Sequence, residues 1–117
     1  MLKLNKNTAI YVASHAVDCR KAIDGLSALI VEEIDKAPND GSVYVFYNQA
    51  CDRVKCLFWD KNGFVLYHKR LERGRFKLKG RRDGLLSISE EQLSWLLAGL
   101  DFCLMNEFSH LNYSEYF

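Results

Sequence analysis

Basic residues occupy every second position of the chain from residue 73 to residue 81. They are Arg73, Arg75, Lys77, Lys79 and Arg81. Phe76 and Leu78 lie between three of them. If this segment is extended, a period of two places the cations on one face and the apolar pair on the other. Such a row of positive charge suits the phosphates of a nucleic-acid backbone, which it would contact without reading the bases.

Two simpler structures show the same pattern, and both remain open. A charged strand face is commonly just a face in contact with water, and basic residues on an edge strand also prevent sheets from aggregating. Aromatic residues are interleaved with the basic ones, and they could stack on the bases of a single strand or form part of the core. These aromatic residues are Phe58, Trp59, Phe64, Tyr67 and Phe76.

Catalytic and metal-binding patterns are largely missing from the sequence. It contains none of the glycine-rich phosphate-binding motifs and no G-x-S-x-G turn. His15 and Asp18 could form an acid–base pair, although a structural histidine and a capping aspartate fit the same residues. The four cysteines form no C-x-x-C pair, and the three histidines are scattered. We therefore expect free thiols, no metal, no cofactor, no small-molecule ligand and no enzymatic activity.

Charge is segregated along the chain, although the formal net charge is only +1. Eleven basic and two acidic residues lie between Arg53 and Arg82, whereas the segment from Asp83 to Phe117 has six acidic residues and no lysine or arginine. A near-neutral protein with a concentrated basic segment can attract a polyanion locally and stay soluble. The basic segment is therefore the first candidate for a binding surface.

Composition and length predict a small globular protein. A chain of 117 residues with 49% hydrophobic content is long and apolar enough to fold as one domain without disulfides. No apolar run is long enough to span a membrane, and the polar first residues do not resemble a secretory signal. We expect a cytoplasmic protein with no membrane partner. The expected single domain covers residues 1–104, followed by a polar and aromatic tail over 105–117.

The hydrophobic pattern predicts an α+β domain, in which an antiparallel sheet of four to five strands packs with two main helices. Strands are predicted over residues 8–13, 43–47, 53–59, 64–71 and 75–79. One helix is predicted over residues 22–34 with Asp18 as its N-cap. The other begins at Ser89, which forms a capping-box pattern with Gln92 and buries leucines 93, 96, 97 and 100. Asn62 and Gly63 are expected to provide the positive φ of a hairpin turn.

An ordered set of short motifs resembles the accessory protein of insertion sequence 66 (IS66) elements, the product of the second reading frame, often labelled TnpB. This is not the RNA-guided nuclease that shares the label. The resemblance covers about residues 10–101, and its most specific part is the run from Lys69 to Phe76. The other matching positions are Asp18, Arg20, Lys21, Asp24, Gly25, Leu26, Val45, Phe46, Asp52 to Lys55, Trp59, Asp60 and Gly63.

The resemblance implies a small protein that is encoded beside a transposase and aids transposition, while the catalytic acidic residues reside on the larger protein. We expect it to contact DNA phosphates through a basic sheet face. The expected contacts are Arg53, Lys55, Lys69, Arg70, Arg73, Arg75, Lys77 and Lys79. The alternative is an adaptor that binds the transposase through Arg20, Lys21 and Asp24 together with the basic segment. The expected partners are thus DNA, the transposase and other proteins of the same element.

Overall fold

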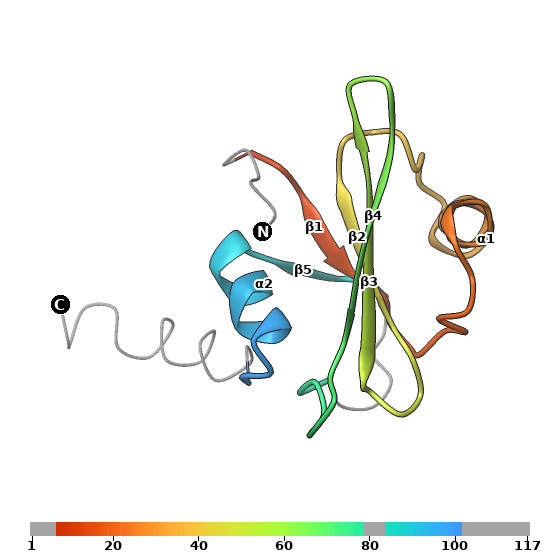
Figure 1. Ribbon diagram of the computed structural model, residues 1–117. Coiled ribbons are helices and arrows are strands. Elements are labelled where there is room, and N and C mark those ends of the chain that lie inside the picture. Colours follow the sequence, from red (N-terminus) through yellow and green to blue (C-terminus); the bar gives the residue numbers. More distant parts are fainter. Residues whose placement is uncertain (1–6, 79–83, 102–117) are drawn as a thin grey trace, which may run out of the picture.

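The computed structural model describes residues 7–78 and 84–101, which form a five-stranded sheet with helices on both faces (Figure 1). The strands are β1 (Ile10–Val12), β2 (Val43–Tyr47), β3 (Arg53–Asp60), β4 (Gly63–Arg70) and β5 (Leu86–Ile88). Helix α1 (Ile23–Leu29) continues as the π-helical segment η1 (Ile30–Ile34), and α2 (Glu90–Leu97) follows β5. The predicted α+β class and the two main helices are confirmed.

The sheet is mixed, whereas the sequence predicted an antiparallel one. The strand order is β4-β3-β2-β1-β5, and β1 pairs with β2 in parallel while the other pairs are antiparallel. The reason is the connection through α1, which carries the chain back so that β2 runs in the direction of β1. All five residues of β2 are buried, as expected for a central strand.

The fifth strand is not the predicted one. Residues 75–78 form no strand, and residue 79 lies outside the described part of the chain. β5 forms instead and pairs with β1, with Ile88 opposite Ile10 and Leu86 opposite Val12. Gly74, with a φ of 76°, bends the chain after β4, and Phe76 N then donates to Cys51 O in the turn before β3 instead of extending a strand.

Each face of the sheet is covered by one helix (Figure 1). Alternation along β2 sends Tyr44 and Phe46 toward α1, and Val43, Val45 and Tyr47 toward α2. The α2 side also buries Leu93, Leu96 and Leu97, whereas Leu26 and Ile30 close the α1 side. Residues 54–57 of β3 are buried between the two helices, whereas β4 consists of half-buried and exposed residues.

The two helices begin differently. In α2 the capping box is present as predicted, since Ser89 Oγ accepts a hydrogen bond from Gln92 N at 3.1 Å and Ser89 N donates to Gln92 Oε1 at 2.9 Å. Leu100 is 49% exposed, so its predicted burial is wrong. In α1 the N-cap is Ala22, which makes no side-chain cap, and the predicted cap at Asp18 is wrong because that carboxylate binds Arg20 instead.

The turn of the β3–β4 hairpin also differs from the prediction. Lys61 adopts the left-handed conformation, with a φ of 53°, while Asn62 and Gly63 do not. The hairpin is nevertheless regular, with register pairs running from Arg53 opposite Arg70 to Asp60 opposite Gly63. Within residues 7–78 and 84–101, no helix combines the length and apolar character needed to cross a bilayer.

Candidate nucleic-acid interface

Residues 71–78, here called the basic loop, follow β4 and are anchored at both ends. Leu71 N donates to Asp52 O at 2.8 Å, and Phe76 N donates to Cys51 O at 2.7 Å. Phe76 and Leu78 are buried, with 2% and 6% of their surface exposed. The loop is therefore fastened to the turn before β3 by backbone hydrogen bonds and by two apolar side chains in the core.

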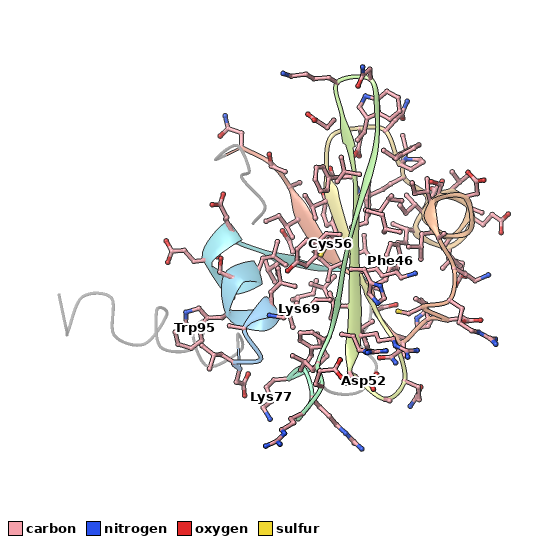
Figure 2. All side chains as sticks on the ribbon, in the orientation of Figure 1. Phe46, Asp52, Cys56, Lys69, Lys77 and Trp95 are labelled. Atoms are coloured by element: carbon pink, nitrogen blue, oxygen red, sulfur yellow. The ribbon has the colours of Figure 1, made fainter. Side chains whose placement is uncertain are left out.

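The alternation predicted for this segment is present even though the strand is not. Phe76 and Leu78 point inward, while Arg73, Arg75 and Lys77 are exposed. Figure 2 shows Lys77 at the same end of the molecule as Asp52, below the sheet and opposite the Lys61 turn. Among the residues that the structure describes, none of these three cations forms a salt bridge. No acidic side chain of residues 7–78 and 84–101 therefore neutralises them.

The cations of the hairpin do not share one face with each other. The register places Arg53 opposite Arg70 and Lys55 opposite His68, so these four side chains share the face covered by α1. Lys69 lies opposite Val54 and therefore on the face covered by α2. The cations predicted to form one basic sheet face are thus divided between the two faces of the sheet.

Two of the predicted contacts are occupied inside the protein. Lys55 is only 8% exposed, and its ammonium donates to the backbone oxygen of Lys21 at 2.8 Å, just before α1. Lys69 donates from Nζ to Leu97 O at 2.7 Å, at the end of α2 (Figure 2). A cation at the carboxyl end of a helix is favoured by the helix dipole and by the unpaired carbonyls there. Each lysine therefore fastens one helix to the sheet.

The remaining predicted contacts differ in exposure and pairing. Arg53 is half-buried, and Arg70 is exposed and forms an ion pair with Glu72, with a distance of 2.9 Å between Nε and Oε2. Lys79 lies outside the described residues. Sequence reasoning missed the internal roles of Lys55 and Lys69, and no local pattern signals them, because their acceptors on Lys21 and Leu97 lie 34 and 28 positions away.

A carboxylate marks the junction between the hairpin and the basic loop. Asn48 Nδ2 donates to Asp52 Oδ1 at 2.7 Å, and this hydrogen bond is the main cause that lowers the pKa of Asp52. Burial opposes the shift, and the positive charges of Arg53 and Arg70 add to it. Asn48 Oδ1 also accepts from the backbone N–H groups of Asp52 and Arg53. Asp52 is therefore ionised at neutral pH and held in one orientation beside the arginines.

The residues proposed for partner binding lie together at the start of α1. Arg20, Lys21 and Asp24 are all exposed. Arg20 forms a two-pronged contact with Asp18, with 3.0 Å between Nη2 and Oδ2, and the hydrogen bonds that Arg20 donates lower the pKa of Asp18 to about 2. The guanidinium of Arg20 is therefore exposed but already paired.

His15 has partners other than Asp18. Its Nδ1 lies 2.9 Å from Ser14 Oγ, and its Nε2 lies 3.7 Å from Glu33 Oε1, at the edge of a cavity of about 390 Å³. Cys19, Cys51 and Cys56 carry free thiols. The described segments contain no group of three or more histidine, cysteine and acidic side chains that could hold a metal ion.

Comparisons with known proteins identify one family and two relatives. The family described as IS66 Orf2 like protein matches residues 8–107. Uncharacterized protein y4jC of Sinorhizobium fredii (strain NBRC 101917 / NGR234) is 38% identical over 102 residues, which cover 87% of each chain. Uncharacterized protein y4hO of the same strain is 33% identical over 102 residues, covering 87% of this chain and 89% of the relative. No solved structure matches the chain.

Proposed function

The chain belongs to the family of IS66 Orf2-like proteins, and from this premise we propose that it is a non-enzymatic accessory factor of DNA transposition that contacts DNA phosphates through its basic loop. The family is one of accessory proteins of an insertion sequence, which accounts for the transposition part of the proposal. The DNA contact, the cytoplasmic location and the association with the transposase of the same element belong to the proposal as well.

One observation carries the DNA contact. Arg73, Arg75 and Lys77 are exposed and unpaired in the described structure, while the apolar residues between them are fixed in the core. A loop held in this way loses little backbone freedom when a ligand binds, so more of the electrostatic attraction remains as affinity. Contacts of exposed arginine and lysine side chains with phosphates carry no sequence information, so little sequence preference is expected.

Fluorescence anisotropy with a labelled duplex tests the proposal. Each neutralised phosphate contributes about −0.9 to the slope of log K against log salt concentration. Replacing Arg73, Arg75 and Lys77 together by glutamine should therefore flatten the slope by nearly 3 (about 2.7). Two single variants form the matched control pair. Arg75→Gln removes one exposed charge from the basic loop, and Lys61→Gln removes one exposed charge from the turn at the opposite end of the hairpin. Only Arg75→Gln should flatten the slope; a wild-type protein without any anisotropy change at low salt would refute the proposal.

The adaptor function is the second candidate, and the grouping of Arg20, Lys21 and Asp24 at the start of α1 favours it. Lys55 fixes the backbone of Lys21, so these exposed side chains project from a defined position. If the protein is an adaptor, Lys21→Glu with Asp24→Lys should abolish co-purification with the transposase and leave DNA anisotropy unchanged. If that double variant still binds the transposase and the basic-loop variant does not, the basic loop is the partner surface instead.

A further inference from the structure

The α1 face of the hairpin carries a compact group of four basic side chains, defined here as the basic square. Its corners are Arg53, Lys55, His68 and Arg70, with Arg53 opposite Arg70 and Lys55 opposite His68. Directly opposed side chains start about 5 Å apart, and same-face neighbours along one strand are roughly 6.8 Å apart. The four side chains are therefore attached to the sheet close enough together for one small anion to contact nitrogen atoms of several of them.

This arrangement is unfavourable for the protein alone. Like charges placed directly opposite in a sheet destabilise the pairing, and a buried ammonium is costly without an anion. Arg70 has Glu72, and Asp52 lies close enough to both arginines for them to lower its pKa. Lys55, 8% exposed, has only a neutral carbonyl as its acceptor in the described structure. The Lys55–His68 half of the basic square therefore lacks a negative charge.

His68 can act as a neutral donor in this place. Burial lowers its pKa, and the positive charges of Lys55, Arg53 and Arg70 lower it further. The imidazole is therefore uncharged at neutral pH, so it adds no repulsion to the square and keeps one N–H to donate. Its own protonation would become easier if an anion entered, because the surrounding positive charge would then be balanced.

Space for a ligand lies beside Arg53. A hollow of about 360 Å³ is lined by Arg20, Asn48 and Arg53, with Cys19 in its wall. Asp18 also lines it, and its carboxylate is already paired with Arg20 at 3.0 Å. Arg53 is the corner of the basic square that lines this hollow, and Lys55 follows two residues along β3 on the same face of the sheet. Burial raises the pKa of the Cys19 thiol, which therefore contributes no negative charge at neutral pH. The volume lies in the range of small-ligand sites and exceeds what one oxyanion needs.

We propose that the basic square is a binding site for a phosphate group, with the hollow beside Arg53 admitting whatever is attached to it. Arg53 supplies a planar pair of donors, Lys55 a fixed charge and His68 a neutral N–H. The phosphate is either free inorganic phosphate or a terminal phosphate of a DNA strand. The site uses other cations than the basic loop, although Arg70 pairs with Glu72 of that loop. It goes beyond the proposed function, on which only the DNA source of the phosphate rests.

The full-length protein titrated with inorganic phosphate tests the site, with histidine resonances followed by NMR. We expect saturable binding to one site and an upward shift of the His68 pKa in the presence of phosphate. Arg53→Gln should weaken binding about tenfold or more, the usual effect of losing a charge-assisted hydrogen bond. Lys61→Gln, which removes a distant charge, should leave the affinity unchanged. An unsaturable response, or equal loss in both variants, would overturn the site.

Lys55 is left unchanged in these variants because its replacement also affects the anchoring of α1. His68→Gln, at an exposed position, provides the second test and should also weaken phosphate binding if the fold is intact by circular dichroism. Unaltered affinity in both Arg53→Gln and His68→Gln would refute the basic square even if the protein binds phosphate elsewhere.

Oligonucleotides with and without a 5′-phosphate separate the two sources of the ligand. If a DNA end is the ligand, the phosphorylated strand should bind more tightly, and this preference should survive in the triple basic-loop variant but vanish in Arg53→Gln. If free phosphate is the ligand, inorganic phosphate binds and the two strands do not differ. Loss of DNA binding with retained phosphate binding in the basic-loop variant would separate the two proposals.

Discussion

Two sets of cations from one basic segment have opposite roles in the folded protein. Lys55 and Lys69 come from the β3–β4 hairpin and donate hydrogen bonds to carbonyls at the start of α1 and the end of α2. Arg75 and Lys77, a few residues further along the chain, are exposed and unpaired among the described residues. Local charge density therefore identifies a basic segment, but the fold decides which of its charges remain available to a ligand.

The difference arises from how each segment is covered. Successive residues of a strand face opposite sides, and at the positions of Lys55 and Lys69 each side meets a helix or its start. The basic loop has a core contact on one side only, through Phe76 and Leu78, so its intervening side chains must point into water. Variants of buried or internally bonded side chains should therefore change stability, whereas variants of the exposed loop cations should change DNA binding.

The largest effect is expected at Phe76, which anchors the basic loop. Truncation of a fully buried phenylalanine costs about 3–5 kcal/mol, so Phe76→Ala should lower the free energy of unfolding by that amount. Its exposed neighbour provides the control, since Arg75→Gln should change stability by less than about 0.5 kcal/mol. Urea denaturation followed by tryptophan fluorescence measures both, and equal stabilities would contradict the inward position of Phe76.

A matched pair of lysines gives the second test. Lys69→Met removes the hydrogen bond to Leu97 and should cost about 1–2 kcal/mol of stability, with no change in the salt dependence of DNA binding. Lys77→Met should do the reverse, leaving stability within about 0.5 kcal/mol and flattening the salt slope by about 0.9. If Lys69→Met flattened the slope while the fold stayed intact, Lys69 would be a DNA contact. The contrast between the hairpin lysines and the exposed cations of the basic loop would then be wrong.

Local patterns were the part of this fold that the sequence could predict. The strand Val43–Tyr47 and the capping box of Ser89 and Gln92 depend on neighbouring residues only, and both form as predicted. The inward position of Phe76 and Leu78 follows from alternation in the same way. The exposed, alternating cations of the basic loop could thus be found without a structure.

Features that depend on distant partners were not predictable in this way. Parallel pairing of β1 with β2, and the pairing of β5 with β1, join segments that are far apart in the chain. Alternation in residues 75–78 indicates one buried side but not the presence of a neighbouring strand, so the predicted strand there was wrong. The engagement of Lys55 with Lys21 spans 34 positions, and no local pattern encodes it.

Arg20 represents a third case, because its side chain is exposed but already paired with Asp18. The loss of this pair should have the smallest effect on stability of the changes considered. Because Arg20 holds the pKa of Asp18 at about 2, against roughly 3.9 in an unfolded chain, the pair stabilises the protein fully above about pH 4. That contribution should fall as the pH drops from about 4 through about 2, where Asp18 becomes protonated in the folded state as well. Asp18→Asn should therefore remove a small part of the acid dependence of stability in this window. NMR titration of the carboxyl carbon should show the pKa of Asp18 rising in Arg20→Gln; an unchanged pKa would mean that Arg20 is as free as Arg75, and it would then join the basic loop as a candidate DNA contact.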